Sequence, residues 1–241
     1  MKYPTIRVLS DAGELAAAAA ELIVGQSERA IADRGSFHIA LSGGNTPKVL
    51  YELLASDAYL DEVDWPHWHV YFGDERCVGP DHPDSNYRMA RAALFDHVPL
   101  DGRNLHRMKG EIDPQQAAGE YDQLLKDAFA DAGLDLILLG LGDDGHTASL
   151  FPGTAALSET HRRCVANFVP KLDAWRLTLT APFINRARQV VVLVSGEAKA
   201  KKVTEVLEGP RDPQRLPIQL IQPQSGELLW LLDAPAAGMT P

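Results

Sequence analysis

The sequence predicts an α/β fold in which a doubly wound, mostly parallel sheet carries helices on both faces. Short β-rich runs alternate with longer stretches of helical pattern, and several of the runs are apolar on both sides. Strands of that kind belong in a parallel sheet that is covered on both faces. We expect six strands, at residues 5–9, 37–41, 68–73, 135–141, 190–195 and 228–233.

Helix candidates occupy the segments between these strands. Asp11 is placed to cap the first, Thr46 to cap the second with Pro47 at its first position, and Ser85 or Asp84 to cap the third. After the first helix, which begins at Asp11, we expect helices at 47–56, 84–96, 114–131 and 197–208.

The composition describes an ordinary globular chain, which we expect to form one domain over residues 1–241. Hydrophobic residues make up 45% and charged residues 23% of it. The formal net charge of -10 argues against a nucleic-acid partner, so an anionic ligand must be bound by local groups.

The sequence also indicates the cellular compartment in which the protein is expected. No apolar run approaches the roughly 20 residues that a membrane span needs, and the segment "MKYPTIRVLSDAGE" lacks the apolar stretch of a signal peptide. Cys77 and Cys164 do not suggest a disulfide framework, so we expect a cytoplasmic protein without a membrane partner.

In open α/β sheets, ligands bind at the carboxyl ends of the strands. The segment 42–46, "SGGNT", follows the second expected strand and precedes a helix, an arrangement that exposes N–H donors to an anion. The spacing of a Walker A loop is missing, so a phosphate monoester fits better than a nucleoside triphosphate. The alternative is that Gly43 and Gly44 merely turn the chain.

Two further strand ends carry cations. Asp74, Glu75 and Arg76 directly follow an apolar strand, so they either pair with each other or meet a ligand, and Arg76 is a candidate to bind an oxyanion. Lys199 lies near an expected helix N-terminus, where it opposes the helix dipole and favours a bound anion.

The segment 140–153, "GLGDDGHTASLFPG", contains a G-x-G-x-x-G spacing. A dinucleotide site needs a long helix behind the glycines, whereas Pro152 is expected to stop this one after about two turns. His146 with Asp144 beside it suits general acid–base chemistry, and Asp143 is expected to shape the turn. The alternative is that Asp144 caps the short helix while His146 packs beside it.

Rival chemistries find weaker support. His67 and His69 alternate on an expected strand, but a third zinc ligand at suitable spacing is not evident, so we expect no metal. Cys77 has no base beside it in the sequence, which favours an inert thiol. A G-x-S-x-G elbow is absent from the sequence, so a serine nucleophile is disfavoured.

Four motifs in order carry a family resemblance: "ALSGGNTP", "DERCVGPDHPDSN", "LLGLGDDGHTASLFPG" and "VSGEAKA". With these four motifs the chain resembles the 6-phosphogluconolactonase family. That family is related to the glucosamine-6-phosphate deaminases and has a ribose-5-phosphate isomerase-like fold. The resemblance runs nearly end to end. Asn45 stands where serine is commoner in the family, and Gly79 where proline is frequent.

The resemblance implies a metal-independent enzyme without a cofactor that hydrolyses 6-phospho-D-glucono-1,5-lactone to 6-phosphogluconate. His146 would be the catalytic base, oriented by Asp144, with Arg76 at the oxyanion and Arg176 as a further substrate contact. The substrate phosphate would bind Ser42, Gly43, Gly44, Asn45, Thr46 and Lys199. The alternatives are a sugar-phosphate deaminase or isomerase of the same fold, and a sensor that binds a sugar phosphate without catalysis.

Overall fold

A computed structural model describes residues 4–239, so residues 1–3 and 240–241 of the expected 1–241 unit lie outside the described residues. Its main sheet has the strand order β1-β9-β8-β5-β2-β3, and every neighbouring pair is parallel. The six expected strands are confirmed. They are β1 (Thr5–Leu9), β2 (Phe37–Leu41), β3 (Trp68–Phe72), β5 (Leu136–Leu139), β8 (Gln189–Val194) and β9 (Glu227–Asp233).

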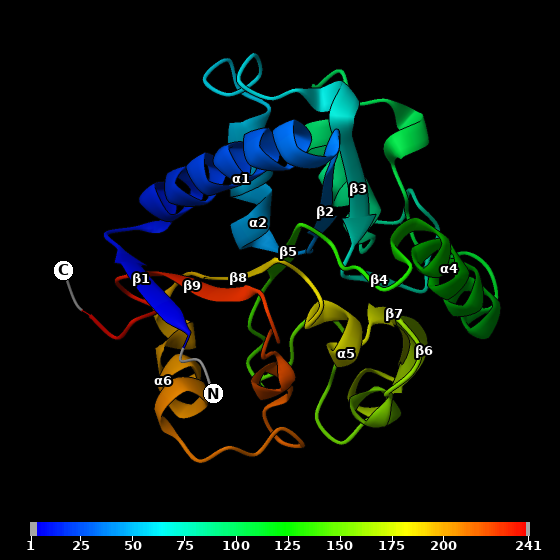
Figure 1. Cartoon of the computed structure of the whole chain (residues 1–241). Coiled ribbons are helices and arrows are strands. Elements are labelled where there is room, and N and C mark those ends of the chain that lie inside the picture. Colours follow the sequence, from blue (N-terminus) through cyan, green and yellow to red (C-terminus); the bar gives the residue numbers. More distant parts are fainter. Residues whose placement is uncertain (1–3, 240–241) are drawn as a thin grey trace.

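Helices cover both faces of this sheet (Figure 1), as the doubly wound pattern predicts. α1 and α2 lie on one side, and α6 lies on the other side beneath β1 and β9. The carboxylate of Asp11 caps α1 by accepting from the backbone N–H groups of Gly13 and Glu14, at 2.8 and 2.9 Å. The helices are α1 (Ala12–Arg34), α2 (Asn45–Leu54), α3 (Asn86–Ala90), α4 (Pro114–Phe129), α5 (Ala181–Ile184) and α6 (Ala200–Glu208). No helix among residues 4–239 is long and apolar enough to cross a membrane.

The start of the second helix differs from the sequence prediction. α2 begins at Asn45 with Gly44 in the cap position, so Thr46 is not its cap and Pro47 is not its first residue. The Thr46 hydroxyl instead lies 2.6 Å from the Ser195 hydroxyl at the end of β8. The predicted helix over 84–96 is α3, capped by Ser85 as expected, followed directly by a π-helical turn over 91–95.

A second, three-stranded antiparallel sheet was not predicted. It contains β4 (Asp74–Arg76), β7 (Ala174–Leu179) and β6 (Cys164–Val169), in the order β4-β7-β6. β4 consists of three charged residues, a composition that gives no strand signal. The β6–β7 hairpin brings its tip, a short 3-10 turn over Pro170–Leu172, to the carboxyl ends of the main strands.

Three histidines stack against the face of β2 and β3 that α4 covers. The rings of His38 and His69 lie 4.7 Å apart, those of His69 and His106 lie 5.8 Å apart, and Phe129 of α4 packs 5.3 Å from His38. Burial lowers the pKa of His38 and of His106 to about 4. The rings of His38 and His106 are therefore uncharged packing groups at neutral pH.

Candidate active site

A cavity of about 420 Å³ lies at the carboxyl ends of the main strands, where the sequence analysis expected a ligand. Segments that follow β2, β3, β5 and β8 meet there with the tip of the β6–β7 hairpin. Most of the predicted site residues line it, namely Ser42, Gly43, Gly44, Arg76, Asp144, His146, Arg176 and Lys199. Asn45 and Thr46 are not in this lining; they form the first turn of α2.

His146 and Asp144 form a tight pair at one wall of the cavity. His146 Nδ1 lies 2.5 Å from Asp144 Oδ1, and Asp144 Oδ1 also accepts from the His146 backbone N–H at 3.2 Å. The Phe151 ring stacks on the imidazole at 4.0 Å. Since Nδ1 faces the carboxylate, Nε2 is the ring nitrogen left for other chemistry.

The loop that carries this pair is a series of turns, not the predicted two-turn helix. Residues 140–153 contain one isolated bridge between Thr147 and Leu150, and Ala148 adopts a left-handed conformation with φ 46°. The Thr147 hydroxyl donates to the Gly140 carbonyl at 2.9 Å, which holds the turn closed. The alternative role of Asp144 as a helix cap is therefore wrong.

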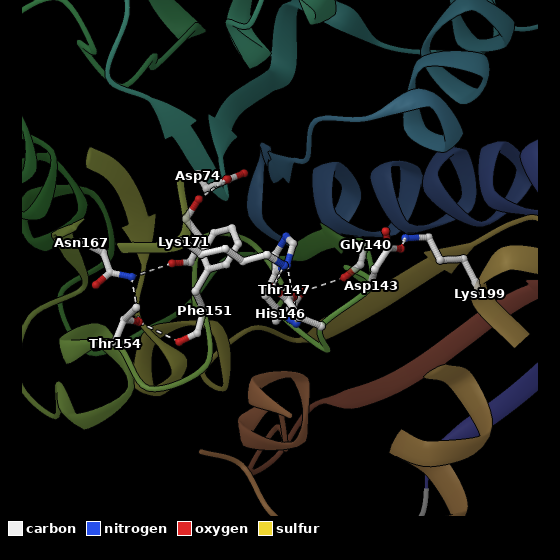
Figure 2. A network of polar contacts seen from close by, with 12 residues as sticks. Asp74, Gly140, Asp143, His146, Thr147, Phe151, Thr154, Asn167, Lys171 and Lys199 are labelled. Carbon is white, nitrogen blue, oxygen red and sulfur yellow. Dashed lines mark hydrogen bonds and ion pairs between the residues drawn. The ribbon is translucent and has the colours of Figure 1, made fainter. Parts of the chain in front are cut away.

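Lys171 is a site residue that the sequence analysis missed. It comes from the hairpin tip and extends toward His146 (Figure 2). Its Nζ donates to Asp144 Oδ2 at 3.0 Å, so that carboxylate binds both Lys171 and His146. Burial alone would raise the pKa of Asp144, but the hydrogen bonds from His146 and Lys171 bring it down to about 2. Asp144 is consequently ionised throughout the neutral range.

Asp143 does more than shape the turn, because it pairs with Lys199. The Lys199 Nζ lies 2.5 Å from Asp143 Oδ1, and this hydrogen bond lowers the pKa of Asp143. The sequence predicted that an anion holds Lys199, and in this structure the anion is the Asp143 carboxylate. The side chain of Asp143 is 85% exposed, so a ligand anion can compete for Lys199 at little structural cost.

The glycine turn between β2 and α2 is fixed from behind by Tyr51. The Ser42 N–H donates to the Tyr51 hydroxyl at 3.0 Å, and that hydroxyl donates to the Ser42 carbonyl at 2.8 Å. Gly44 has φ 109°, a conformation that favours glycine. Ser42 is one of the residues that line the cavity, and its buried hydroxyl has no hydrogen-bond partner within the described part of the chain. A buried polar group of this kind calls for a partner that the described part of the chain does not supply.

Arg76 and Arg176 face each other across the β4–β7 pair and both line the cavity. Arg76 donates to the Asp84 carbonyl and Arg176 to the Trp175 carbonyl, and within residues 4–239 neither forms an ion pair with a carboxylate. Burial, followed by the nearby charge of Arg76, lowers the pKa of Arg176. The two guanidinium groups therefore form a cationic wall that attracts an anion.

Asp74 and Glu75 are buried and hydrogen-bonded instead of pairing with the guanidinium of Arg76. Glu75 accepts from Ser85 and from the backbone N–H groups of Asn86 and Tyr87, at 2.7 to 3.0 Å. Burial raises the pKa of Glu75 against these bonds. The acids thus hold the start of α3 against the cavity, a function that the sequence reasoning left open.

The rival chemistries find no support in the described residues. His67 pairs with Asp64 at 2.8 Å while His69 stacks in the histidine group. No group of three or more His, Cys, Asp or Glu side chains within residues 4–239 could hold a metal ion. Burial raises the pKa of Cys77 to about 11, as expected for an inert thiol.

A family model described as glucosamine-6-phosphate isomerases/6-phosphogluconolactonase matches residues 10–230. The chain is 48% identical over 239 residues to a 6-phosphogluconolactonase from Synechocystis sp., and the match covers 97% of both chains. It is 30% identical to a solved structure of 6-phosphogluconolactonase from Trypanosoma brucei, with a TM-score of 0.86 and 99% of both chains covered.

The fold is also that of a glucosamine-6-phosphate deaminase. A solved monomeric deaminase superposes with a TM-score of 0.82 over 98% of this chain and 100% of that one, at 23% identity. That likeness shows the fold alone. The family match and the sequence identity show more: the chain belongs to the glucosamine-6-phosphate isomerase/6-phosphogluconolactonase family.

Proposed function

We propose that this chain is a 6-phosphogluconolactonase, which hydrolyses 6-phospho-D-glucono-1,5-lactone to 6-phosphogluconate in the pentose phosphate pathway. One observation carries the proposal. A carboxylate-oriented imidazole, His146 with Asp144, lines the same 420 Å³ cavity as an anion-binding glycine turn. The full-length identity to enzymes with this name supports the same substrate.

The substrate phosphate binds the glycine turn. Backbone N–H groups of Gly43 to Thr46 and the unpartnered Ser42 hydroxyl, once its side chain rotates into the cavity, supply neutral donors, and Lys199 supplies charge after it leaves Asp143. Asn45 and Thr46 contribute through the backbone of the first turn of α2, since their side chains are outside the cavity lining. A phosphate in this position directs the lactone ring toward His146.

The chemical step is the attack of a water molecule on the lactone carbonyl carbon, C1. Nε2 of His146 takes a proton from water while the new C–O bond forms, and Asp144 stabilises the resulting imidazolium. Collapse of the tetrahedral species breaks the bond between C1 and the ring oxygen, which receives the proton from His146. Arg76, with Arg176 beside it, stabilises the oxyanion. No cofactor enters this sequence.

The experiment is a lactonase assay on freshly prepared 6-phosphogluconolactone, measured against its spontaneous hydrolysis. His146→Ala should lose most of the turnover, by about 10²–10⁴-fold for a general base, and should keep its affinity for 6-phosphogluconate. Lost affinity with normal turnover at saturation would reverse the roles of the base and the phosphate site.

The same preparation separates the alternatives. Release of ammonia from glucosamine 6-phosphate would identify a deaminase, and thermal stabilisation by 6-phosphogluconate without lactone turnover would identify a sensor. We expect neither result, because a binding protein gains little from an oriented imidazole.

We further propose that residues 1–241 act as one domain in the cytoplasm. The buried apolar residues of both sheets form a single cluster, and both cysteines are free thiols, which suits a reducing compartment. The net charge of -10 continues to argue against nucleic acid as a partner.

A further inference from the structure

Asn86 is a buried amide at the cavity whose orientation its partners determine. It is 3% exposed, stands at the start of α3, and belongs to the cavity lining. Its Nδ2 donates to the Asp74 carbonyl at 2.9 Å and to Asp74 Oδ1 at 3.1 Å. A carbonyl and a carboxylate can only accept, so the nitrogen must face Asp74 and the oxygen must face away.

The amide oxygen of Asn86 lies directly against the phosphate turn. A Cβ atom placed on Gly43 would come within 1.9 Å of Asn86 Oδ1, so this oxygen occupies the space of a side chain at Gly43. No donor from residues 4–239 bonds to it. This oxygen is accessible to solvent, whereas the Ser42 hydroxyl is sealed from it. Asn86 therefore offers a free acceptor beside the anion site.

A bare acceptor next to a dianionic phosphate is unfavourable unless a donor lies near it. The intact substrate ring carries hydroxyls on C2, C3 and C4, and the one on C4 is nearest to the phosphorylated end. Asn86 Oδ1 packs against Gly43, which belongs to the turn that binds the phosphate. A substrate with its phosphate on this turn therefore has its C4 hydroxyl close to Asn86 Oδ1.

We propose that Asn86 is a specificity-determining residue whose amide oxygen accepts a hydrogen bond from the C4 hydroxyl of the substrate. This inference rests on the proposed binding of phosphate at the glycine turn. Asp74 is the positioning residue behind it, because its second carboxylate oxygen is already bound by the Ser149 hydroxyl at 2.6 Å. The site consequently prefers the gluco configuration over its C4 epimer.

Ring-closed, unreactive inhibitors test the contact without hydrolysis. The parent probe is 1,5-anhydroglucitol 6-phosphate, compared with its 4-deoxy, 4-deoxy-4-fluoro and 2-deoxy analogues as competitive inhibitors of lactone turnover. For the wild-type protein we expect the inhibition constants of both C4 analogues to rise about tenfold, since fluorine accepts but cannot donate. A fluoro analogue that binds as tightly as the parent would overturn the proposal without any variant.

Asn86→Ala should remove the difference between the parent and the 4-deoxy analogue, while any penalty for the 2-deoxy analogue stays the same. Arg88→Ala, an exposed change on the same short helix and outside the cavity, should keep the full C4 penalty. A C4 penalty that persists in folded Asn86→Ala would overturn the contact. Equal inhibition by the phosphate-free parent would instead refute the phosphate site, and with it the assignment of the C4 hydroxyl.

Discussion

Gly142 leaves the space in which the His146 ring lies, and replacing it tests the proposed active site. A Cβ atom on residue 142 would come within 2.0 Å of His146 Nδ1 and 2.1 Å of its Cε1. The φ angle of Gly142 is not in the left-handed region, so alanine fits the backbone there. The effect of Gly142→Ala should therefore come from the displaced imidazole alone.

The geometry sets the size of the effect. Nonbonded carbon and nitrogen atoms need roughly 3.5 Å, so the ring must move by more than about 1 Å. Such a movement breaks the 2.5 Å contact between His146 and Asp144. A displacement of this size at a catalytic group costs about 10²-fold, and complete loss of a general base costs about 10²–10⁴-fold. We expect kcat of Gly142→Ala to fall at least about 100-fold while KM changes little.

Gly140→Ala is the matched control in the same loop, because its methyl group would meet no atom within 4 Å. Initial rates on fresh lactone should give near wild-type kcat for this variant. If Gly142→Ala retains half or more of the wild-type kcat, the imidazole in this position is not the base.

Three other predictions concern charge. Asp144→Asn should lower kcat, because the imidazolium that forms during turnover loses a carboxylate at 2.5 Å; an unchanged kcat would separate Asp144 from the base. Lys199→Met should raise KM for the phosphorylated lactone more than for unphosphorylated gluconolactone, since the ammonium binds phosphate only in the first; equal effects would argue against that contact. Burial lowers the pKa of His38 and His106 to about 4, whereas an unfolded histidine has a pKa of about 6.5. Between these two values the unfolded chain binds more protons than the folded one. The stability of the fold therefore decreases as the pH falls from about 6.5 to about 4. We expect the free energy of unfolding in urea to be lower at pH 4.5 than at neutral pH by about 1–2 kcal/mol per histidine, after allowing for solvent screening. His106→Gln should flatten this dependence on pH.

Most of the main sheet was predictable because its central strands are buried on both faces, whereas the edge strand β1 is exposed. A run such as 190–194 is apolar at nearly every position, and only a strand covered on both sides needs that composition. Strand β4 of the small sheet was not predictable, because Asp74 to Arg76 are three charged residues that form a strand only through their pairing with β7. Tertiary contacts, and not local preference, make those three residues a strand.

The site could be predicted where one segment supplies it, and not where segments meet. His146 and Asp144 are two positions apart, so the sequence showed the pair. Lys171 is 27 positions from Asp144, and no spacing rule connects them. Asn86 lies directly after a helix cap, a position at which a helix does not require an amide side chain. That unexplained residue type was the only available signal for it.

The charges at the cavity explain how two adjacent acids can lie in a site for an anion. Asp143 and Asp144 each have a lysine partner, at 2.5 and 3.0 Å, and both carboxylates have a lowered pKa. The lining contains three acidic and four cationic side chains, so these groups carry a net charge of +1, against -10 for the chain. In the proposed mechanism, Asp143 gives up Lys199 to the phosphate, whereas Asp144 keeps Lys171 and His146. One acid therefore releases a cation to the substrate, and the other holds the base in place.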